Sequence, residues 1–187
     1  MPEKEDLTYQ FRVHGYPMWK YIKDEFSKQP SQLKVVMKLI SIGLRVVNSD
    51  GEVKIFCDDI EIKPNSLAKA LKVDRRVVVE VMEKIVRDST LGPFFKELFP
   101  VANLGRASSK MGFGVIQIVP DSATRPAIIS GVSQIIAREG ISIRQVIMDD
   151  PEINEDPRGI IVTDSPVPAT LLPEIRRVPG VEAVVIL

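Results

Sequence analysis

Residues 115–187 alternate between two hydrophobic periods, and this alternation constrains the fold more than any other feature of the sequence. Apolar runs of strand length cover residues 115–119, 141–147, 159–163 and 181–187. Residues 125–139 instead follow helical spacing, with apolar side chains at Ile128, Ile129, Val132, Ile135 and Ile136. A second helical pattern contains Leu171, Leu172, Ile175 and Val178. The expected element order is therefore β-α-β-β-α-β.

This order is that of the ferredoxin-like motif. Right-handed crossovers then place both helices on one face of a four-stranded antiparallel sheet, with the second and fourth strands at its edges. The last strand, which contains Val181, Val184, Val185, Ile186 and Leu187, is close to uniformly apolar. Because unpaired apolar edges promote association, we expect this protein to form a homodimer, by edge-to-edge or face-to-face pairing with a second copy.

The first part of the chain has a different pattern, mostly helical. Apolar spacing predicts one helix over residues 18–29 and a longer one from Pro30 through Leu44, followed by short strands within residues 53–62. A connection rich in Gly, Pro and Ser spans residues 89–109, and Phe94, Phe95, Leu98 and Phe99 are expected to pin it to an apolar surface. We therefore expect an α+β protein with two domains, 1–110 and 111–187.

The inventory of reactive side chains argues against catalysis. The chain has one cysteine, Cys57, and one histidine, His14, which excludes an internal disulfide and leaves little for a metal site. The adjacent acids Asp58-Asp59 and Asp149-Asp150 are interpreted as solvated turns. We expect no catalytic residue, no metal, no cofactor and no enzyme activity. No apolar run reaches the about 18 residues of a membrane span, so a cytoplasmic protein without a membrane partner is expected.

Two short motifs in the second part resemble the ACT-domain family. They are Arg125-Pro126-Ala127 and Glu139-Gly140-Ile141-Ser142-Ile143, where the family usually has Arg-Pro-Gly and Gly-Ile-Asn-Ile. The resemblance covers residues from about 113 to 187. It implies a module that binds a small molecule, mostly an amino acid, at an interface between paired copies. It also implies effector contacts at Ser122, Thr124 and Ser142. Ala127 stands where the family has glycine and lies at the same site, with a less close backbone approach to the ligand.

The chemistry of these residues suits a ligand that carries opposite charges. Thr124 can cap the helix, and Pro126 fits its first position, so the helix start and Arg125 together favour a carboxylate. Asp121 and Ser122 can receive an ammonium or a hydroxyl group. The hydroxyls of Ser122, Thr124 and Ser142 suit a sugar-like ligand as well as an amino acid. The expected site is a hydroxyl-lined pocket beneath the amino end of one helix.

Residues 65–78 resemble a helix-turn-helix. Ala68, Leu71, Val73 and Val78 occupy the small and apolar positions of that motif, and Lys72 stands where the family often has a turn glycine. Either Lys72 adopts an unfavourable left-handed conformation, or the turn differs from that of the family. Arg75 and Arg76 begin the second helix and are candidate DNA contacts, as are Lys34, Lys38 and Lys72.

Charge is unevenly distributed between the two parts. Residues 1–110 contain 19 basic and 15 acidic side chains, and residues 111–187 contain 6 and 10. We expect a ligand-responsive regulator of amino-acid metabolism, with a DNA-binding N-terminal domain and an effector-binding C-terminal domain. The alternative is a regulatory subunit that binds a metabolic enzyme through its N-terminal helices without contacting DNA.

Overall fold

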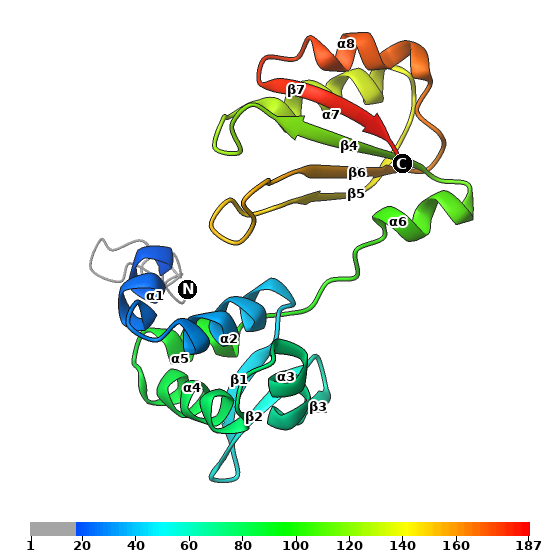
Figure 1. Cartoon of the computed structure of the whole chain (residues 1–187). Helices are drawn as coiled ribbons and strands as arrows, with labels where there is room; N and C mark the ends of the chain where they lie inside the picture. The colour runs from blue at the N-terminus through cyan, green and yellow to red at the C-terminus, as the bar shows by residue number, and fades with distance from the viewer. Residues whose placement is uncertain (1–17) are drawn as a thin grey trace, which may run out of the picture. The chain divides into compact units, whose positions relative to one another are not determined.

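The computed structural model describes residues 18–187 and has an α+β fold with two antiparallel sheets. The chain divides into two compact units after Val101 (Figure 1). The sequence interpretation put the division at residue 110. Residues 102–104 belong to the second unit because Gln145 holds them: its Nε2 donates to Ala102 O at 2.8 Å, and its Oε1 accepts from Leu104 N at 3.0 Å.

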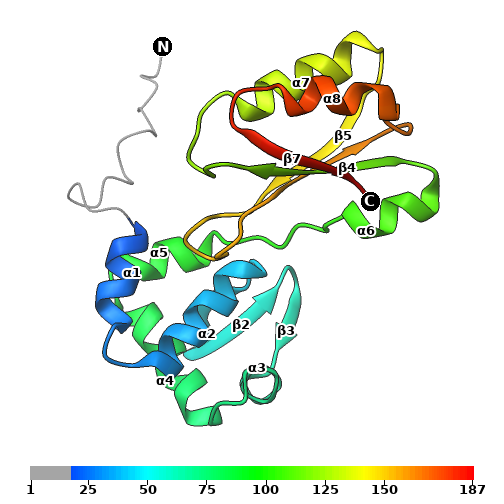
Figure 2. The ribbon, with the colours of Figure 1, turned by 45° about the horizontal axis from the view of Figure 1, so that its top comes forward.

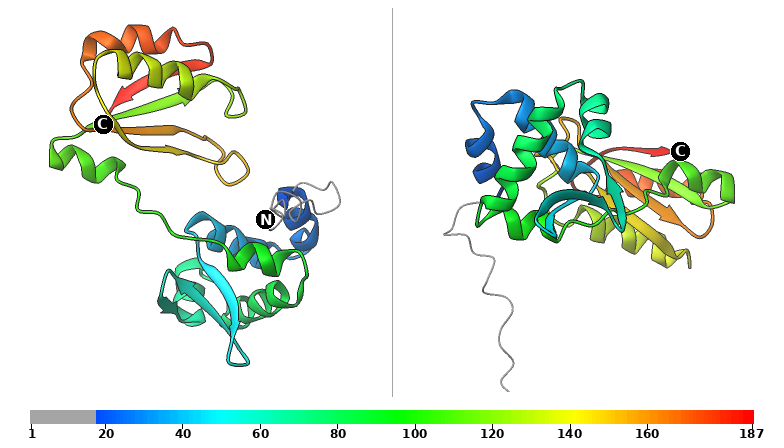
Figure 3. Two further views of the ribbon diagram at one scale, coloured as in Figure 1. Left: turned by 180° about the vertical axis from the view of Figure 1, so that it is seen from behind. Right: turned by 90° about the horizontal axis from the view of Figure 1, so that it is seen from below.

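The N-terminal unit combines helices with a three-stranded sheet. Its elements are α1 (Met18–Phe26), α2 (Pro30–Ser41), β1 (Arg45–Ser49), β2 (Glu52–Cys57), β3 (Ile60–Ile62), α3 (Pro64–Leu71), α4 (Arg75–Arg87) and α5 (Leu91–Lys96). The strands pair antiparallel in the order β1-β2-β3, and β1 lies against α4 and α5 (Figure 3). Fully buried side chains from α1, α2, the sheet and α4, among them Phe26, Leu39, Ile55 and Ile85, form one core.

The predicted continuation of the second helix through Leu44 is wrong. Gly43 adopts φ 67°, its N–H donates to Ile40 O at 3.0 Å, and Leu44 N–H donates to Leu39 O at 2.8 Å. These two bonds are a Schellman motif, which closes a helix by satisfying its last carbonyls. Leu44 is buried after this turn, and the chain continues into β1, a strand that helical spacing did not predict.

The connection after α4 is anchored through Asp88. Its Oδ1 accepts from the N–H groups of Thr90 and Leu91, both at 2.8 Å, and its Oδ2 accepts from the Tyr21 hydroxyl at 2.7 Å. Burial alone would raise the pKa of Asp88, but these hydrogen bonds together hold it below its usual value. The hydrogen bond from the Tyr21 hydroxyl to Asp88 raises the pKa of Tyr21. Phe95 is fully buried as expected, whereas Phe99 is 62% exposed and does not pin the connection.

The second unit contains a four-stranded sheet covered on one face by two helices (Figure 2). Its elements are α6 (Gly105–Ser108), a 3₁₀ turn (Ser109–Met111), β4 (Gly114–Pro120), α7 (Ile128–Arg138), β5 (Ile143–Met148), β6 (Gly159–Thr163), a 3₁₀ turn (Ala169–Leu171), α8 (Leu172–Arg176) and β7 (Val181–Ile186). The strand order is β5-β6-β4-β7 with every pair antiparallel, so β5 and β7 lie at the edges as the sequence predicts.

The core of this unit lies between the sheet and the two helices. Ile116 and Ile118 of β4, Ile161 of β6, Ile136 of α7 and Ile175 of α8 are all fully buried. Four apolar side chains of the edge strands stay exposed: Val146 and Met148 on β5, at 39% and 40%, and Val185 and Ile186 on β7, at 42% and 48%. The helices therefore bury one face of the sheet and leave both edges accessible.

Candidate functional site

The loop between β4 and α7, residues 121–127, brings five of the six predicted ligand residues together. Arg125 Nε donates to Asp121 Oδ1 at 2.9 Å, and the hydroxyls of Ser122 and Thr124 lie 3.1 Å apart. Asp121 N–H donates to Gly180 O at 2.9 Å, and Arg125 N–H donates to Ser122 O at 3.1 Å. The two charged groups expected to recognise an amino acid, Asp121 and Arg125, therefore pair with each other.

The start of α7 differs from the prediction. The helix begins at Ile128, so Pro126 does not occupy its first position and Thr124 does not cap it. The cap residue is Ala127, whose backbone is left-handed with φ 71° and ψ −1°. The proline restricts Arg125 to extended or turn conformations, and the chain must then turn sharply to enter the helix. No side chain caps the helix start, which leaves its first N–H groups without an intrahelical or side-chain acceptor.

Ser142 lies at the opposite end of the sheet from this loop. It immediately precedes β5, and both Ile143 of β5 and Gly114 at the start of β4 pair with Thr163 of β6. The loop follows Pro120 at the other end of β4. Ser142 N–H donates to Asp164 Oδ1 at 3.2 Å, and its carbonyl accepts from Asp164 N–H at 2.9 Å. One copy of the unit therefore does not bring Ser142 to the other candidate residues.

A groove of about 670 Å³ lies beside the start of α7. Its lining includes Arg125, Ala127, Ser130, Gln134 and Val178. The expected hydroxyls of Ser122, Thr124 and Ser142 do not line it. A hydroxyl-lined pocket under the amino end of the helix is thus not formed within one unit.

Residues 65–78, which resemble a helix-turn-helix, form most of α3, a turn and the start of α4. Lys72 is left-handed, with φ 55° and ψ 47°, so of the two possibilities for the turn between α3 and α4 the chain adopts the left-handed one. Ala68, Leu71 and Val78 are buried where the two helices cross. Asp74 caps α4 by accepting from Arg76 N–H at 2.7 Å. A carboxylate consequently occupies the amino end of the helix that the resemblance assigns to DNA recognition.

The predicted DNA contacts have different environments. Arg75, Arg76, Lys38 and Lys72 are exposed. Lys34 Nζ donates to Leu71 O at 2.7 Å and closes the end of α3, so it serves a structural bond that the sequence did not predict.

Acidic and amide groups accompany these cations. Glu80 Oε2 accepts from Gln32 Nε2 at 3.2 Å, which joins α4 to α2. Glu83 pairs with Arg87 at 2.9 Å on the same helix. The exposed surface of α4 therefore mixes both signs of charge.

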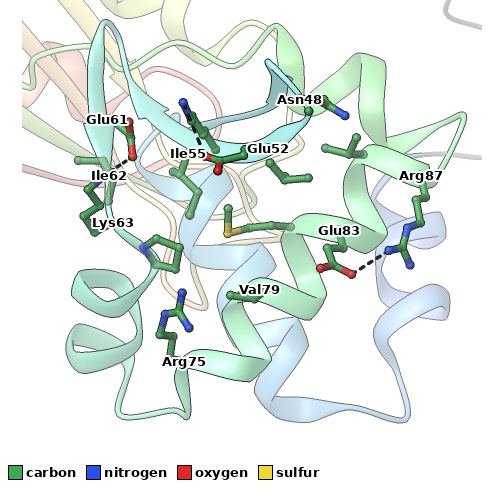
Figure 4. A pocket seen from close by; sticks show the side chains of 16 residues that line it. Asn48, Glu52, Ile55, Glu61, Ile62, Lys63, Arg75, Val79, Glu83 and Arg87 are labelled. Carbon is green, nitrogen blue, oxygen red and sulfur yellow. Dashed lines mark hydrogen bonds and ion pairs between the residues drawn. The ribbon is translucent and has the colours of Figure 1, made fainter.

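A second groove was not predicted from the sequence. It has a volume of about 660 Å³ and lies between α4 and strands β2 and β3 (Figure 4). Val79, Met82 and Val86 of α4 line it. The available signal was the composition of α4, which carries more apolar residues than one buried face needs.

The remaining candidates have structural environments. Cys57 is partly buried, and Asp58 occupies the turn between β2 and β3 with φ 55°. Asp149 Oδ2 accepts from Arg158 N–H at 3.1 Å. His14 lies outside the described residues. Within residues 18–187 no group of three His, Cys, Asp or Glu side chains could hold a metal ion, and no helix is long and apolar enough to cross a membrane.

Comparisons with known proteins do not identify a family. No family model matches the chain, and no curated protein matches it. Among solved structures, the crystal structure of PH0061 aligns over 84% of this chain and 88% of its own chain, at 14% identity and a TM-score of 0.25.

Proposed function

We propose that the chain is a ligand-responsive regulatory protein in which the second unit is an ACT-type module for a small polar metabolite and the first unit presents a helix-turn-helix to DNA. One observation carries the sensor assignment. Ala127 is left-handed at the position where the Arg-Pro-Gly pattern has glycine, the residue that adopts this conformation without strain. The strand order β5-β6-β4-β7, with both helices on one face, is that of the ferredoxin-like motif and supports the same assignment.

The β4–α7 loop suits a ligand with an ammonium and a carboxylate group. Asp121 and Arg125 pair with each other across a half-exposed surface, at 42% and 47% side-chain exposure. Such an ion pair contributes about 0–1 kcal/mol to the stability of the fold, so separating the two side chains costs little. A bound amino acid would then gain one charged contact with Asp121 and one with Arg125. The uncapped start of α7 adds N–H donors and a partial positive charge for the carboxylate. The adjacent hydroxyls of Ser122 and Thr124 favour a hydroxylated ligand.

A complete site needs a second copy of the unit. Ser142 lies at the far end of the same sheet from the loop, so only a partner can bring a Ser142 to it. A ligand held between two copies would favour one arrangement of the dimer over others. It would shift the spacing of the two attached helix-turn-helix segments by its difference in affinity for these arrangements.

Isothermal titration of the full chain against the twenty amino acids and common sugars tests the sensor. We expect one class of ligand to bind and Asp121→Asn to weaken binding of an amino acid by about tenfold, the worth of one charge-assisted contact. Glu139→Gln is the matched control, since this exposed carboxylate follows the other end of α7. If none of these ligands binds at millimolar concentration, the sensor proposal is wrong.

The DNA assignment rests on Arg75 and Arg76, exposed at the start of α4 after the left-handed turn at Lys72. Mobility shifts at 50 mM salt with native-promoter and non-specific DNA test it. Arg76→Gln should weaken binding several-fold, and Lys96→Gln, which removes an exposed charge from α5, should not. Absence of any shift excludes DNA binding by this unit.

A second candidate function is binding to a metabolic enzyme through the N-terminal helices. The carboxylates of Asp74, which caps α4, and of Glu83 on α4 favour it, because they repel phosphates and suit a protein partner. Recovery of the same enzyme from a lysate, lost in Arg76→Glu and accompanied by no DNA shift, distinguishes this function from the first.

A further inference from the structure

The groove between α4 and the three-stranded sheet has an apolar floor. Ile55 of β2 is fully buried and Met82 of α4 is 2% exposed, and the partly buried Val79 and Val86 continue the floor along α4. Figure 4 shows Ile55 on the strand side of the groove and Val79 on the helix side. The volume of about 660 Å³ falls in the range of small-molecule sites, about 300–1,000 Å³.

Charged side chains form the rim of the groove, and three ion pairs neutralise most of them. Lys63 Nζ lies 2.5 Å from Glu61 Oε1, Arg87 lies 2.9 Å from Glu83 Oε2, and Lys54 Nζ lies 4.0 Å from Glu52 Oε2. The pairing with Lys63 lowers the pKa of Glu61, so this carboxylate stays ionised at neutral pH.

Arg75 is the cation of the rim that takes part in none of these three ion pairs. Its guanidinium makes no hydrogen bond or ion pair with any other residue of the described part of the chain, 18–187. Because three carboxylates and four cations line the groove, Arg75 gives it one excess positive charge. That charge lies at one end of the groove, at the first residue of α4, where the helix dipole adds to it.

We infer that this groove binds a small organic monoanion with an apolar body, of the class of medium-chain or aryl carboxylates. The carboxylate would accept two parallel hydrogen bonds from the Arg75 guanidinium, and the apolar body would cover Val79, Met82 and Val86. This site lies in the N-terminal unit and is separate from the β4–α7 loop. It does not depend on the proposed function. If DNA binds through Arg75, a bound carboxylate would compete with it.

Isothermal titration of the full chain with octanoate tests the inference. We expect one octanoate per chain, about tenfold weaker binding in Arg75→Gln, and a comparable loss when 1-octanol replaces octanoate, because each change removes the charge-assisted contact. Arg76→Gln is the matched control: Arg76 carries the same charge on the next residue, does not line the groove, and should leave octanoate affinity unchanged.

Methyl NMR on ¹³C-methionine-labelled protein localises the ligand. The chain has six methionines, of which Met82 lines the groove and Met148 lies on β5 of the other unit. Octanoate should shift the Met82 methyl signal and leave that of Met148 in place. Val79→Ser, which makes the floor polar, should weaken binding even if Arg75→Gln proves poorly folded by circular dichroism.

Absence of octanoate binding at millimolar concentration overturns the inference. So does binding that leaves the Met82 signal unmoved, or that survives both Arg75→Gln and Val79→Ser unchanged. The DNA proposal fails separately: octanoate binding without a mobility shift refutes DNA binding alone, and a mobility shift without octanoate binding refutes the groove alone.

Discussion

Replacing Ala127 by glycine should stabilise the second unit. The left-handed conformation of Ala127, with φ 71°, costs an L-residue about 1–2 kcal/mol because its Cβ crowds the backbone. Glycine avoids this strain, but its greater freedom in the unfolded chain costs about 0.4–1 kcal/mol. Ala127 is exposed, so little packing is lost with its methyl group. The balance is a net stabilisation of about 0.5–1 kcal/mol.

Thermal and urea denaturation followed by circular dichroism measure this difference. For a unit the size of residues 102–187, the change raises Tm by about 2–8 °C. Because the chain has two units, the transition that moves must be assigned to the second one. The Met148 methyl signal on β5 reports that transition directly.

Ala123→Gly is the matched control in the same loop. Ala123 is not among the residues with positive φ, so glycine there brings the entropic cost without relieving strain. We expect it to destabilise the unit by about 0.5–1 kcal/mol. If Ala127→Gly lowers the stability as much as Ala123→Gly does, the left-handed entry into α7 is wrong, and the strongest support for the ACT-type assignment is lost.

Three further predictions concern the cap after α4, the end of α2 and the sheet edges. Asp88→Asn should lower the stability of the first unit by about 1–2 kcal/mol in urea denaturation at pH 7. Since the folded state lowers the pKa of Asp88, its contribution is complete above the unfolded pKa of about 4 and is lost as pH falls through the folded value, so the two proteins should converge in acid. Gly43→Ala should lower the free energy of unfolding by more than 2 kcal/mol, because the added Cβ would lie 2.4 Å from the backbone carbonyl oxygen of Phe99. Gly51→Ala, with open space around the added Cβ, should lower it by about 1 kcal/mol. Equal losses of stability in the two variants would refute the close approach at Gly43. Val146→Pro on β5 should convert a dimer to a monomer, as measured by light scattering, and Ile186→Pro on β7 should not. In each strand the N–H group that proline removes points away from the neighbouring strand, so the hydrogen bonds of the sheet within one copy stay intact.

The element order of the second unit follows from the sequence because its segments have unambiguous periods. Period-two and continuous apolar runs became β4, β5, β6 and β7, and the Ile-rich helical pattern became α7. The helix start is less predictable. Thr124 and Pro126 both match the usual signals for it, yet Ala127 takes a conformation that sequence preferences disfavour, and the helix begins two residues later than the proline.

The end of α2 had a signal that apolar spacing obscured. Leu44 fits the helical stripe and also the apolar position after a Schellman turn, so spacing alone does not distinguish the two. Gly43 does, because a glycine after the last helical turn favours termination. Gly43 therefore indicates the end of the helix and leaves residues 45–49 to form β1.

The candidate sites differ in how far apart in the sequence their residues lie. Asp121, Ser122, Thr124 and Arg125 meet because they are neighbours in one loop, which local reasoning can anticipate. The position of Ser142 depends on strand order, and the groove at α4 depends on how the helix meets β2 and β3. Neither follows from spacing along the chain, since both are set by long-range pairing.

The distance across the sheet decides which edge a shared site would use. Neighbouring strands lie about 4.8 Å apart, and antiparallel edge pairing sets the loop end of one sheet beside the opposite end of its partner. Pairing through β5 separates β4 of one copy from β5 of the other by three strand spacings, about 14 Å. Pairing through β7 separates the same two strands by five strand spacings, about 24 Å, a distance that a small ligand cannot bridge. The loop also leads into α7, which packs against β5, whereas α8 packs against β7. The more apolar edge, β7, is therefore the poorer edge for a site that uses both Arg125 and a partner's Ser142. A dimer that shares the proposed site would pair through β5.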